Sequence, residues 1–333
     1  MLNLRKIAVV MSSLALAVTM TACSDGGEEG SNGSEAGVDE FTIVVPSDPG
    51  GGWDQTARAM QKAFADSDLA SQVEVTNVPG GSGTVGLAQV AAKKGQSDVM
   101  LMSGLAMVSA VATTGSDTKM SDLTPIARLM GEYEAIVVPV DSKYNTLKQL
   151  VDDIKADPQS VPIAGGAAGS ADQLFLGLLA EEVGIDPTDL NYVPFSGGGE
   201  ALTSILGGKV SAGVSGTGEF SEQVKAGKIR VLAVSSDKKV SSLPDAPTIT
   251  EAGYKTVFSN WRGVVVPADM DEGDKTAYID LVKKMHDSDS WQDTLKTQAW
   301  DDQYLSGDEF ATWLSGEEER AAKVLATLGL AAK

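Results

Sequence analysis

The sequence predicts an α/β fold with two lobes, and two observations support this prediction. Short apolar segments alternate with glycine-rich turns and amphipathic segments, which is the pattern of strands followed by helices. The pattern runs from residue 41 to about residue 113, and it starts again after an extended stretch at residues 125–139. A chain that leaves one lobe, builds a second and returns near residues 258–267 forms two crossover segments, which predict a hinge and a ligand-binding cleft.

The first series of elements begins at residue 41. An apolar strand at residues 41–46 precedes an amphipathic helix at residues 53–66, whose apolar residues fall on one face. The same pattern predicts strands at residues 73–76 and 99–102, and helices at residues 84–93 and 105–113.

The second series begins with a helix at residues 147–155, which Thr146 can cap with its side-chain oxygen. The other predicted elements of this series are a helix at residues 171–183 and strands at residues 161–164, 192–193, 210–214 and 229–234. A last strand is predicted at residues 264–267, followed by a mostly helical end. These elements predict lobe I at residues 41–135 and 260–333, and lobe II at residues 136–259.

The N-terminal segment has the features of an export signal. Arg5 and Lys6 precede an apolar run, which at about 14 residues is shorter than the roughly 20 that a membrane-spanning helix needs. Residues 1–22 are therefore predicted to be a signal peptide. Cys23, the only cysteine, directly follows Ala22 and resembles the lipidated cysteine of a bacterial lipobox. Residues 23–40 predict a disordered acidic tether behind this anchor, on the outer face of the cell membrane.

The composition argues against several functions. The formal net charge of −20 would repel nucleic acid. One cysteine and one histidine leave no metal cluster and no catalytic triad, and we expect His286 to be a solvated surface residue. The tryptophans at positions 261, 291, 300 and 313 are expected to pack in the core. The sequence therefore predicts a monomeric binding protein without cofactor or metal, and not an enzyme.

Five glycine-rich or small polar loops follow predicted strands, at the edge where open α/β sheets bind ligands. They lie at residues 47–54, 77–86, 103–104, 165–170 and 194–200, with residues 215–218 nearby. Glycines let backbone N–H groups approach a ligand, and the helix start behind each loop adds a partial positive charge of roughly +0.5. Asp54 is expected to begin a helix rather than touch an anion. The loops predict a site that surrounds a compact anion with N–H and hydroxyl donors.

A nucleotide fits these loops poorly. Gly81, Gly83 and Gly86 have the spacing of a dinucleotide-binding fingerprint. The acidic residue that this fingerprint requires after the next strand is missing, because residues 99–102 lead into Ser103 and Gly104.

Several segments resemble one known family. Residues 43–58, IVVPSDPGGGWDQTAR, are similar to the opening segment of receptors of the tripartite tricarboxylate transporter family, the Bug-type extracytoplasmic solute receptors. Residues 77–86 resemble the second glycine loop of that family. The resemblance continues in order through residues 192–200, 206–209, 225–228, 232–234 and 243–253.

The resemblance implies a two-lobe periplasmic-binding-protein (Venus flytrap) fold, with a carboxylate held between the lobes and delivered to an integral-membrane permease. In the family, the first loop and the loop matching residues 195–197 grip the ligand. The ligand-binding residues that the resemblance and the loops suggest are Ser47, Gly50, Gly51, Gly52, Trp53, Ser82, Ser103, Gly169, Ser170, Phe195, Ser196, Gly197 and Thr217.

Two departures from the family leave the ligand open. Many relatives carry a histidine where Asp172 stands and a lysine where Ser196 stands, so this chain has lost positive charge near the cleft. Such a site would suit an anion accompanied by a divalent cation. A tricarboxylate such as citrate, or a dicarboxylate, is the first hypothesis. The alternatives are another solute, such as an amino acid or an aromatic acid, and an enzyme that uses the cleft.

Overall fold

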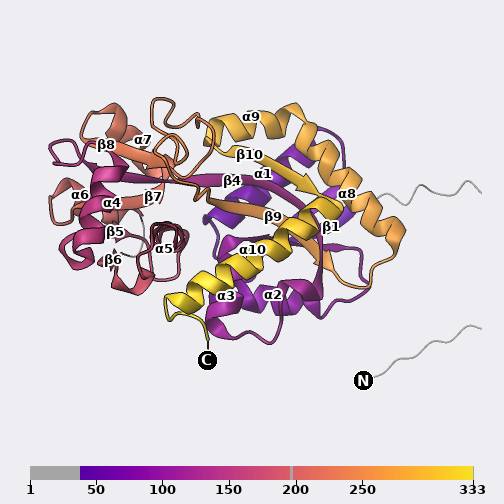
Figure 1. Cartoon of the computed structure of the whole chain (residues 1–333). Helices are drawn as coiled ribbons and strands as arrows, with labels where there is room; N and C mark the ends of the chain where they lie inside the picture. The colour runs from indigo at the N-terminus through magenta and orange to yellow at the C-terminus, as the bar shows by residue number, and fades with distance from the viewer. Residues whose placement is uncertain (1–37, 196–197, 333) are drawn as a thin grey trace, which may run out of the picture. The chain divides into compact units, whose positions relative to one another are not determined.

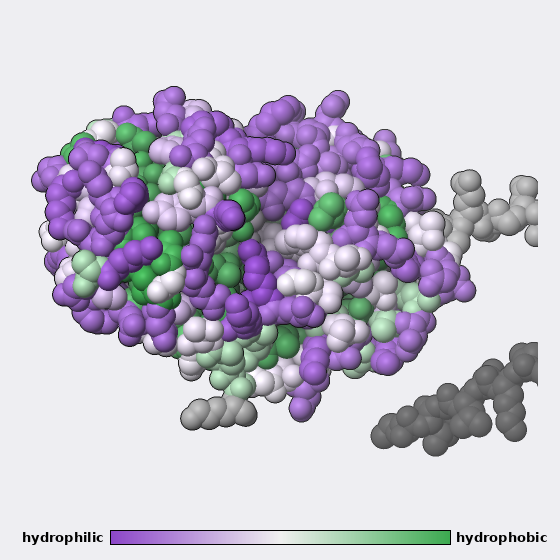
Figure 2. Space-filling model, viewed as in Figure 1, coloured by the Kyte–Doolittle hydropathy of each residue, from purple (hydrophilic) through white to green (hydrophobic). Residues whose placement is uncertain are grey.

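The computed structural model describes residues 38–195 and 198–332. The predicted signal peptide, the predicted lipidation of Cys23 and most of the predicted tether fall outside these residues, as do Ser196 and Gly197. None of the helices in the described part is long and apolar enough to cross a bilayer. The face drawn in Figure 2 is mostly hydrophilic, with apolar side chains gathered in a few patches.

One long strand, β4 (Leu123–Pro139), belongs to both halves of a ten-stranded sheet. Up to Tyr133 it pairs with β9 (Ser259–Pro267), and along part of that length also with β10 (Asp301–Ser306). From Glu134 onward it pairs with β7 (Ala212–Gly216), and from Ala135 with β8 (Ile229–Val234). All these pairings are antiparallel. The strand therefore passes from one group of partners to another between Tyr133 and Glu134.

The remaining strands extend each half of the sheet and pair with one another in parallel; β5 joins β7 in parallel, whereas β3 joins β9 antiparallel. Beyond β9 the order is β3, β1 and β2, and beyond β7 it is β5 and β6. Parallel strands need crossover helices, and the glycine-rich loops lie at the strand ends where these helices begin. The bounds are β1 (Glu40–Val45), β2 (Gln72–Asn77), β3 (Val99–Gly104), β5 (Ile163–Gly165) and β6 (Tyr192–Pro194).

Ten helices cover the described strands. In Figure 1, α4, α5, α6 and α7 surround one end of β4, and α1, α2, α3, α8 and α9 surround the other. Helix α10 contacts α3, β4 and α5. The bounds are α1 (Gly52–Asp66), α2 (Thr84–Ala91), α3 (Leu105–Thr114), α4 (Leu147–Ala156), α5 (Ala171–Val183), α6 (Gly198–Leu206), α7 (Thr217–Lys225), α8 (Glu272–Asp287), α9 (Asp289–Gln298) and α10 (Gly307–Thr327).

The predicted α/β class is confirmed, and each predicted strand and helix is present with somewhat different ends. The predicted cap of α4 is also present, because Thr146 Oγ1 accepts from the Gln149 backbone N–H. The tryptophan prediction holds as well. Trp261 and Trp291 are fully buried, and Trp313 packs edge-on against Trp261 with 5.2 Å between ring centroids.

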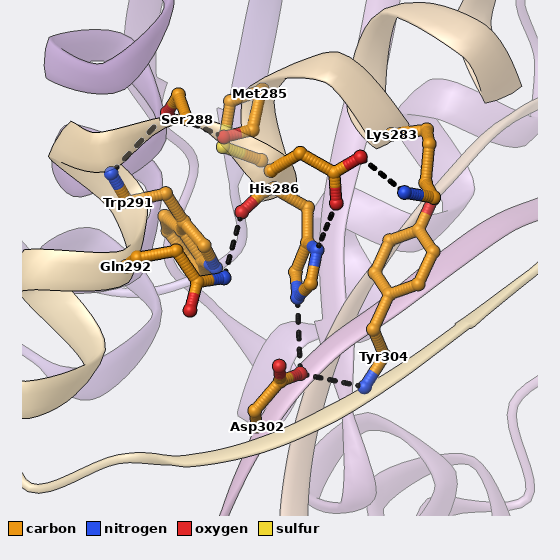
Figure 3. A network of polar contacts seen from close by, with 9 residues as sticks. Lys283, Met285, His286, Ser288, Trp291, Gln292, Asp302 and Tyr304 are labelled. Carbon is orange, nitrogen blue, oxygen red and sulfur yellow. Dashed lines mark hydrogen bonds and ion pairs between the residues drawn. The ribbon is translucent and has the colours of Figure 1, made fainter.

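The prediction for His286 was wrong, because the residue is buried and only 7% exposed. Its Nε2 lies 3.0 Å from Asp302 Oδ1, its Nδ1 lies 3.2 Å from Asp287 Oδ1, and its ring packs on Tyr304 (Figure 3). Asp302 and Tyr304 belong to β10, a strand that the sequence analysis did not predict. The histidine therefore joins α8 to β10.

Candidate functional site

The helices that follow the glycine-rich loops begin without a side-chain cap. The residues that precede α1, α2, α3, α5 and α7 are Gly51, Gly83, Gly104, Ser170 and Gly216, and none of them makes a side-chain capping hydrogen bond. By contrast α4, α8 and α9 are each capped by their own side chain. The first N–H groups of a helix have no partner within the helix. Helix α10 also begins without a side-chain cap. The five uncapped helices named above all begin beside the glycine-rich or small polar loops.

Two of these helix starts open onto a cavity of about 440 Å³, which we call the loop cavity. It is bounded by one side of α3 from Leu105 to Thr113, by the first residues of α5 and by the loop before α5. Its lining residues are Ser82, Leu105, Ala106, Ser109, Ala110, Thr113, Ala167, Ala168, Gly169, Ser170, Ala171, Asp172, Asn260 and Leu330. Most of them are small, so backbone groups make up much of this surface.

A second cavity, of about 570 Å³, shares Asp172 and Asn260 with the first, and we call it the acidic cavity. The starts of α1 and α7 border it at Gly52, Gly216 and Gly218. Its lining residues are Gly52, Gln55, Glu132, Glu134, Asp172, Ser215, Gly216, Gly218, Glu219, Asn260 and Arg262. Together the two cavities form a site to which both halves of the sheet contribute.

The structure brings some of the predicted binding residues together. Ser82, Gly169 and Ser170 line the loop cavity, and Gly52 lines the acidic cavity. Ser47, Gly50, Gly51, Trp53, Ser103, Phe195 and Thr217 do not line either cavity, and Ser196 and Gly197 lie outside the described residues.

Two of the residues outside the cavities are buried among protein atoms. Ser103 is fully buried and its hydroxyl donates to Met120 Sδ at 3.7 Å. Thr217 is 2% exposed and its Oγ1 accepts from Ser242 Oγ at 2.9 Å. In this structure both hydroxyls therefore form hydrogen bonds within the protein and do not line either cavity.

Trp53 packs between two of the loops. A Cβ atom added at Gly83 would lie 3.1 Å from its ring, and one at Gly104 would lie 3.1 Å from its Nε1. The indole therefore contacts both loops where they lack side chains, and it sets the distance between them.

Asp54 holds the first loop in place, which agrees with its predicted role at a helix start. Its carboxylate accepts the Gly50 N–H at 2.9 Å, the Arg58 Nε–H at 2.9 Å and the Asn77 amide at 3.0 Å. The hydrogen bond from Arg58 is the main reason that the pKa of Asp54 is lowered. The ionised carboxylate therefore connects α1 to the loop after β2.

The acidic side chains of the site were missed by the sequence analysis, apart from Asp172. Glu132 and Glu134 alternate along β4, so they point to the same face of the strand. Two carboxylates at alternate positions of a mostly apolar strand were the available signal. Burial is the largest cause that raises the pKa of Glu134 well above its ordinary value, and it raises the pKa of Asp172 to about 6.

Arg262 is the only cation among the described residues that line the acidic cavity. It pairs with Glu132 and donates from Nη1 to Thr56 Oγ1 at 3.3 Å. A Cβ atom at Gly52 would lie 2.5 Å from Arg262 Nη2, so the glycine at the start of α1 leaves the space that the guanidinium occupies. Its charge is therefore already engaged by the protein.

Comparisons with known proteins agree with this architecture. Residues 56–330 match the family model described as the tripartite tricarboxylate transporter family receptor, TctC. Protein BugT of Bordetella pertussis is 29% identical over 235 residues, which cover 69% of this chain and 71% of BugT.

Solved structures similar to this one include solute-binding proteins. A TctC solute binding protein from Polaromonas, crystallised without ligand, superposes with a TM-score of 0.77 at 25% identity, over 87% of this chain and 99% of that one. An R. palustris protein solved with adipate has a TM-score of 0.68 at 23% identity, over 88% of this chain and 98% of that one. The fold is thus the two-lobe periplasmic-binding-protein fold, and the chain belongs to the TctC family of tripartite tricarboxylate transporter receptors.

Proposed function

We propose that the protein is an extracytoplasmic receptor that captures a small carboxylate in the loop and acidic cavities and delivers it to a tripartite permease. The observation that carries the proposal is the set of helix starts without a side-chain cap at these cavities, because the N–H groups and the dipole at a helix start favour a carboxylate. The similarity of this chain to a protein solved with adipate supports a carboxylate as the ligand. Citrate or another tricarboxylate, or a dicarboxylate, are the candidates.

The pairing of β4 supports the proposed lobe boundaries. We place lobe I at residues 41–135 and 260–333, and lobe II at residues 136–259. The change of partners between Tyr133 and Glu134 supports a boundary near residue 135, and the pairing of Ser259 with Tyr133 supports one near residue 260. Ligand between the lobes would then contact residues of both.

Carboxylate binding predicts a rise in melting temperature. A ligand that binds only the folded state at a hundredfold excess over Kd adds about 2.7 kcal/mol to the free energy of unfolding. We expect such a shift with at least one of citrate, isocitrate, tricarballylate, succinate, aspartate or an aromatic acid, measured by differential scanning fluorimetry. Ala106→Trp, at an exposed position of α3 that lines the loop cavity, should abolish the shift by filling the cavity.

Ala88→Trp is the matched control, because Ala88 is an equally exposed helical alanine that lines neither cavity. It should leave the shift intact. An unchanged melting temperature across the whole panel would count against carboxylate capture, and an equal loss in both variants would count against the proposed location.

The lipid anchor is tested separately. Diacylated Cys23 would hold the protein stably on the membrane, since two chains anchor where one binds only marginally. We expect Cys23→Ser to move the protein from the membrane fraction to the soluble fraction and to abolish labelling by a radioactive fatty acid. Ligand-induced thermal shifts should not change. Membrane recovery equal to that of the unmodified sequence would exclude Cys23 as the anchor.

A further inference from the structure

Glu134 is a buried carboxyl group whose bonding is incomplete. It lies on β4 opposite Gly216 of β7, lines the acidic cavity and is 1% exposed. Its backbone N–H donates to Ser235 Oγ at 2.9 Å, but no described residue forms a hydrogen bond with its side-chain Oε2. A buried polar atom without a partner is costly. A ligand with a hydrogen-bond donor could therefore bind to Glu134 Oε2, which has no partner among the described residues.

Asp172 is the nearest acidic partner of Glu134. It is 8% exposed, and its Oδ2 accepts the Gly166 N–H at 2.7 Å. The charge of Asp172 and a hydrogen bond between the two side chains contribute to the raised pKa of Glu134, after burial. Two carboxyl groups so close together favour the state in which they share a proton.

The other charges around this pair do not neutralise it. Glu132 of β4 and Glu219 of α7 add negative charge, and the Tyr192 hydroxyl of β6 is neutral, because burial raises its pKa. Arg262 of β9 is the only cation that lines the cavity among the described residues, and Glu132 already binds it. The pair therefore lies in a field that attracts a cationic group.

We propose that Glu134 and Asp172 form a subsite for a protonated amino group, so that the ligand is an amino carboxylate rather than a simple carboxylate. This inference rests on the proposed function, because the uncapped helix starts would hold the carboxylate of the same molecule. An ammonium group has three N–H donors and no acceptor, which suits Glu134 Oε2 and the carboxylate of Asp172. Charge-assisted hydrogen bonds of this kind are stronger than neutral ones.

A divalent cation fits these residues less well. The described residues contain no group of three or more His, Cys, Asp or Glu side chains placed to hold a metal ion. Calcium prefers six to eight oxygen ligands, whereas an ammonium group is satisfied by two or three acceptors. The arrangement therefore favours an organic cation.

Binding of an ammonium group is expected to release a proton. The free pair holds a proton, because burial raises the pKa of both groups and the charge of Asp172 raises that of Glu134 further. The bound cation stabilises both carboxylates in the ionised form, so the shared proton passes to solvent and the charge of the site is conserved. Affinity for an amino carboxylate should therefore rise between pH 5.5 and pH 8.

Matched ligand pairs test the subsite. The pairs are L-aspartate with succinate, L-glutamate with glutarate, and L-2-aminoadipate with adipate. Isothermal titration calorimetry at pH 8 should show at least one amino member binding about tenfold or more tightly than its partner, as expected for a charge-assisted hydrogen bond in a buried site. Titrations in two buffers of different ionisation heat should show proton release for that amino member and not for its partner.

Glu134→Gln keeps the shape of the side chain and removes the charge. It should weaken binding of the amino member by about tenfold or more, while the partner acid changes by less than about threefold. Glu222→Gln is the control, since it removes an equal charge from an exposed position of α7 that lines neither cavity and should leave the tenfold preference unchanged. A retained melting temperature of Glu134→Gln confirms that the variant is folded.

The possible results distinguish the ammonium subsite from carboxylate capture alone. Equal or tighter binding of the partner acids, or an unchanged preference in Glu134→Gln, overturns the ammonium subsite and leaves carboxylate capture standing. Binding that requires calcium or magnesium and disappears with a chelator also overturns it in favour of a metal. If no member of any pair binds, the ammonium subsite is overturned, and the thermal-shift panel with citrate and the other acids decides on carboxylate capture.

Discussion

Replacing Trp261 by alanine should lower the free energy of unfolding by about 3 to 5 kcal/mol, the range for deleting a large buried aromatic side chain. The ring is fully buried, and its centroid lies 5.9 Å from that of Phe310 and 5.2 Å from that of Trp313, both on α10. The backbones of β3 and β9 also approach closely here, because a Cβ atom at Gly104 would lie 2.5 Å from the Trp261 carbonyl oxygen. Urea unfolding followed by far-ultraviolet circular dichroism measures the loss.

Trp313→Ala is the control for this substitution. Trp313 is only partly buried and packs on the same cluster, so its removal should cost less than that of Trp261. Trp261→Phe should recover much of the stability, because it keeps an aromatic ring in the cluster. A loss below about 1.5 kcal/mol for Trp261→Ala, outside the range for such deletions, would show that the cluster rearranges to fill the cavity.

The second large effect is on pH dependence: stability should fall as the pH rises from about 4.5 to 7. Burial raises the pKa of Asp172 to about 6, and that of Asp301 to about 6 with help from the charge of Glu132. An acid with a raised folded-state pKa binds more protons folded than unfolded, so its stabilising contribution is lost as it ionises. One pKa unit is worth about 1.36 kcal/mol, so Asp172 alone accounts for about 2 kcal/mol over this range.

His286 acts in the same direction at higher pH. Burial opposes its charge, but hydrogen bonds with Asp302 and Asp287 outweigh burial and raise its pKa. Its contribution is complete below the unfolded-state pKa and is lost as the pH rises through the folded-state pKa. The fall in stability therefore continues beyond the range in which Asp172 titrates.

Asp172→Asn identifies the source of the effect. It removes one of the two titrating groups and should reduce the fall between pH 4.5 and pH 7 by about 2 kcal/mol, with a higher free energy of unfolding at pH 7, while the part due to Asp301 remains. Asp186→Asn is the control. Hydrogen bonds from Thr188 lower the pKa of Asp186, so it contributes stability that is lost only as the pH falls below the unfolded-state value. A profile of Asp172→Asn as steep as that of the unmodified protein would assign the effect elsewhere.

The sequence predicted the fold well because the period of the apolar residues and the glycines at turns are local signals. It missed β10, whose residues 301–306 are mostly polar and form a strand only because β4 offers a free edge. His286 was misjudged for the same reason, since its partners Asp302 and Tyr304 come from that strand.

The candidate site was predictable in its loops and less so in its side chains. Glycine runs marked the helix starts that border the cavities, such as Gly52 and the loop ending at Ser170. The roles of Ser103 and Thr217 depend on Met120 and Ser242, which lie far away in sequence. The closeness of Glu134 and Asp172 likewise depends on how β4 meets α5, which no local pattern encodes.

The exchange of strand partners along β4 also has a mechanical meaning. Glu132 and Glu134 lie on either side of the point where β4 passes from β9 to β7. A molecule bound there would lie close to the hinge axis between the proposed lobes. A rotation of one lobe against the other would move such a molecule little, while the far ends of both lobes would travel furthest. Fluorescent labels that report closure therefore belong at those far ends, for example on α4 and α8, where the displacement is largest.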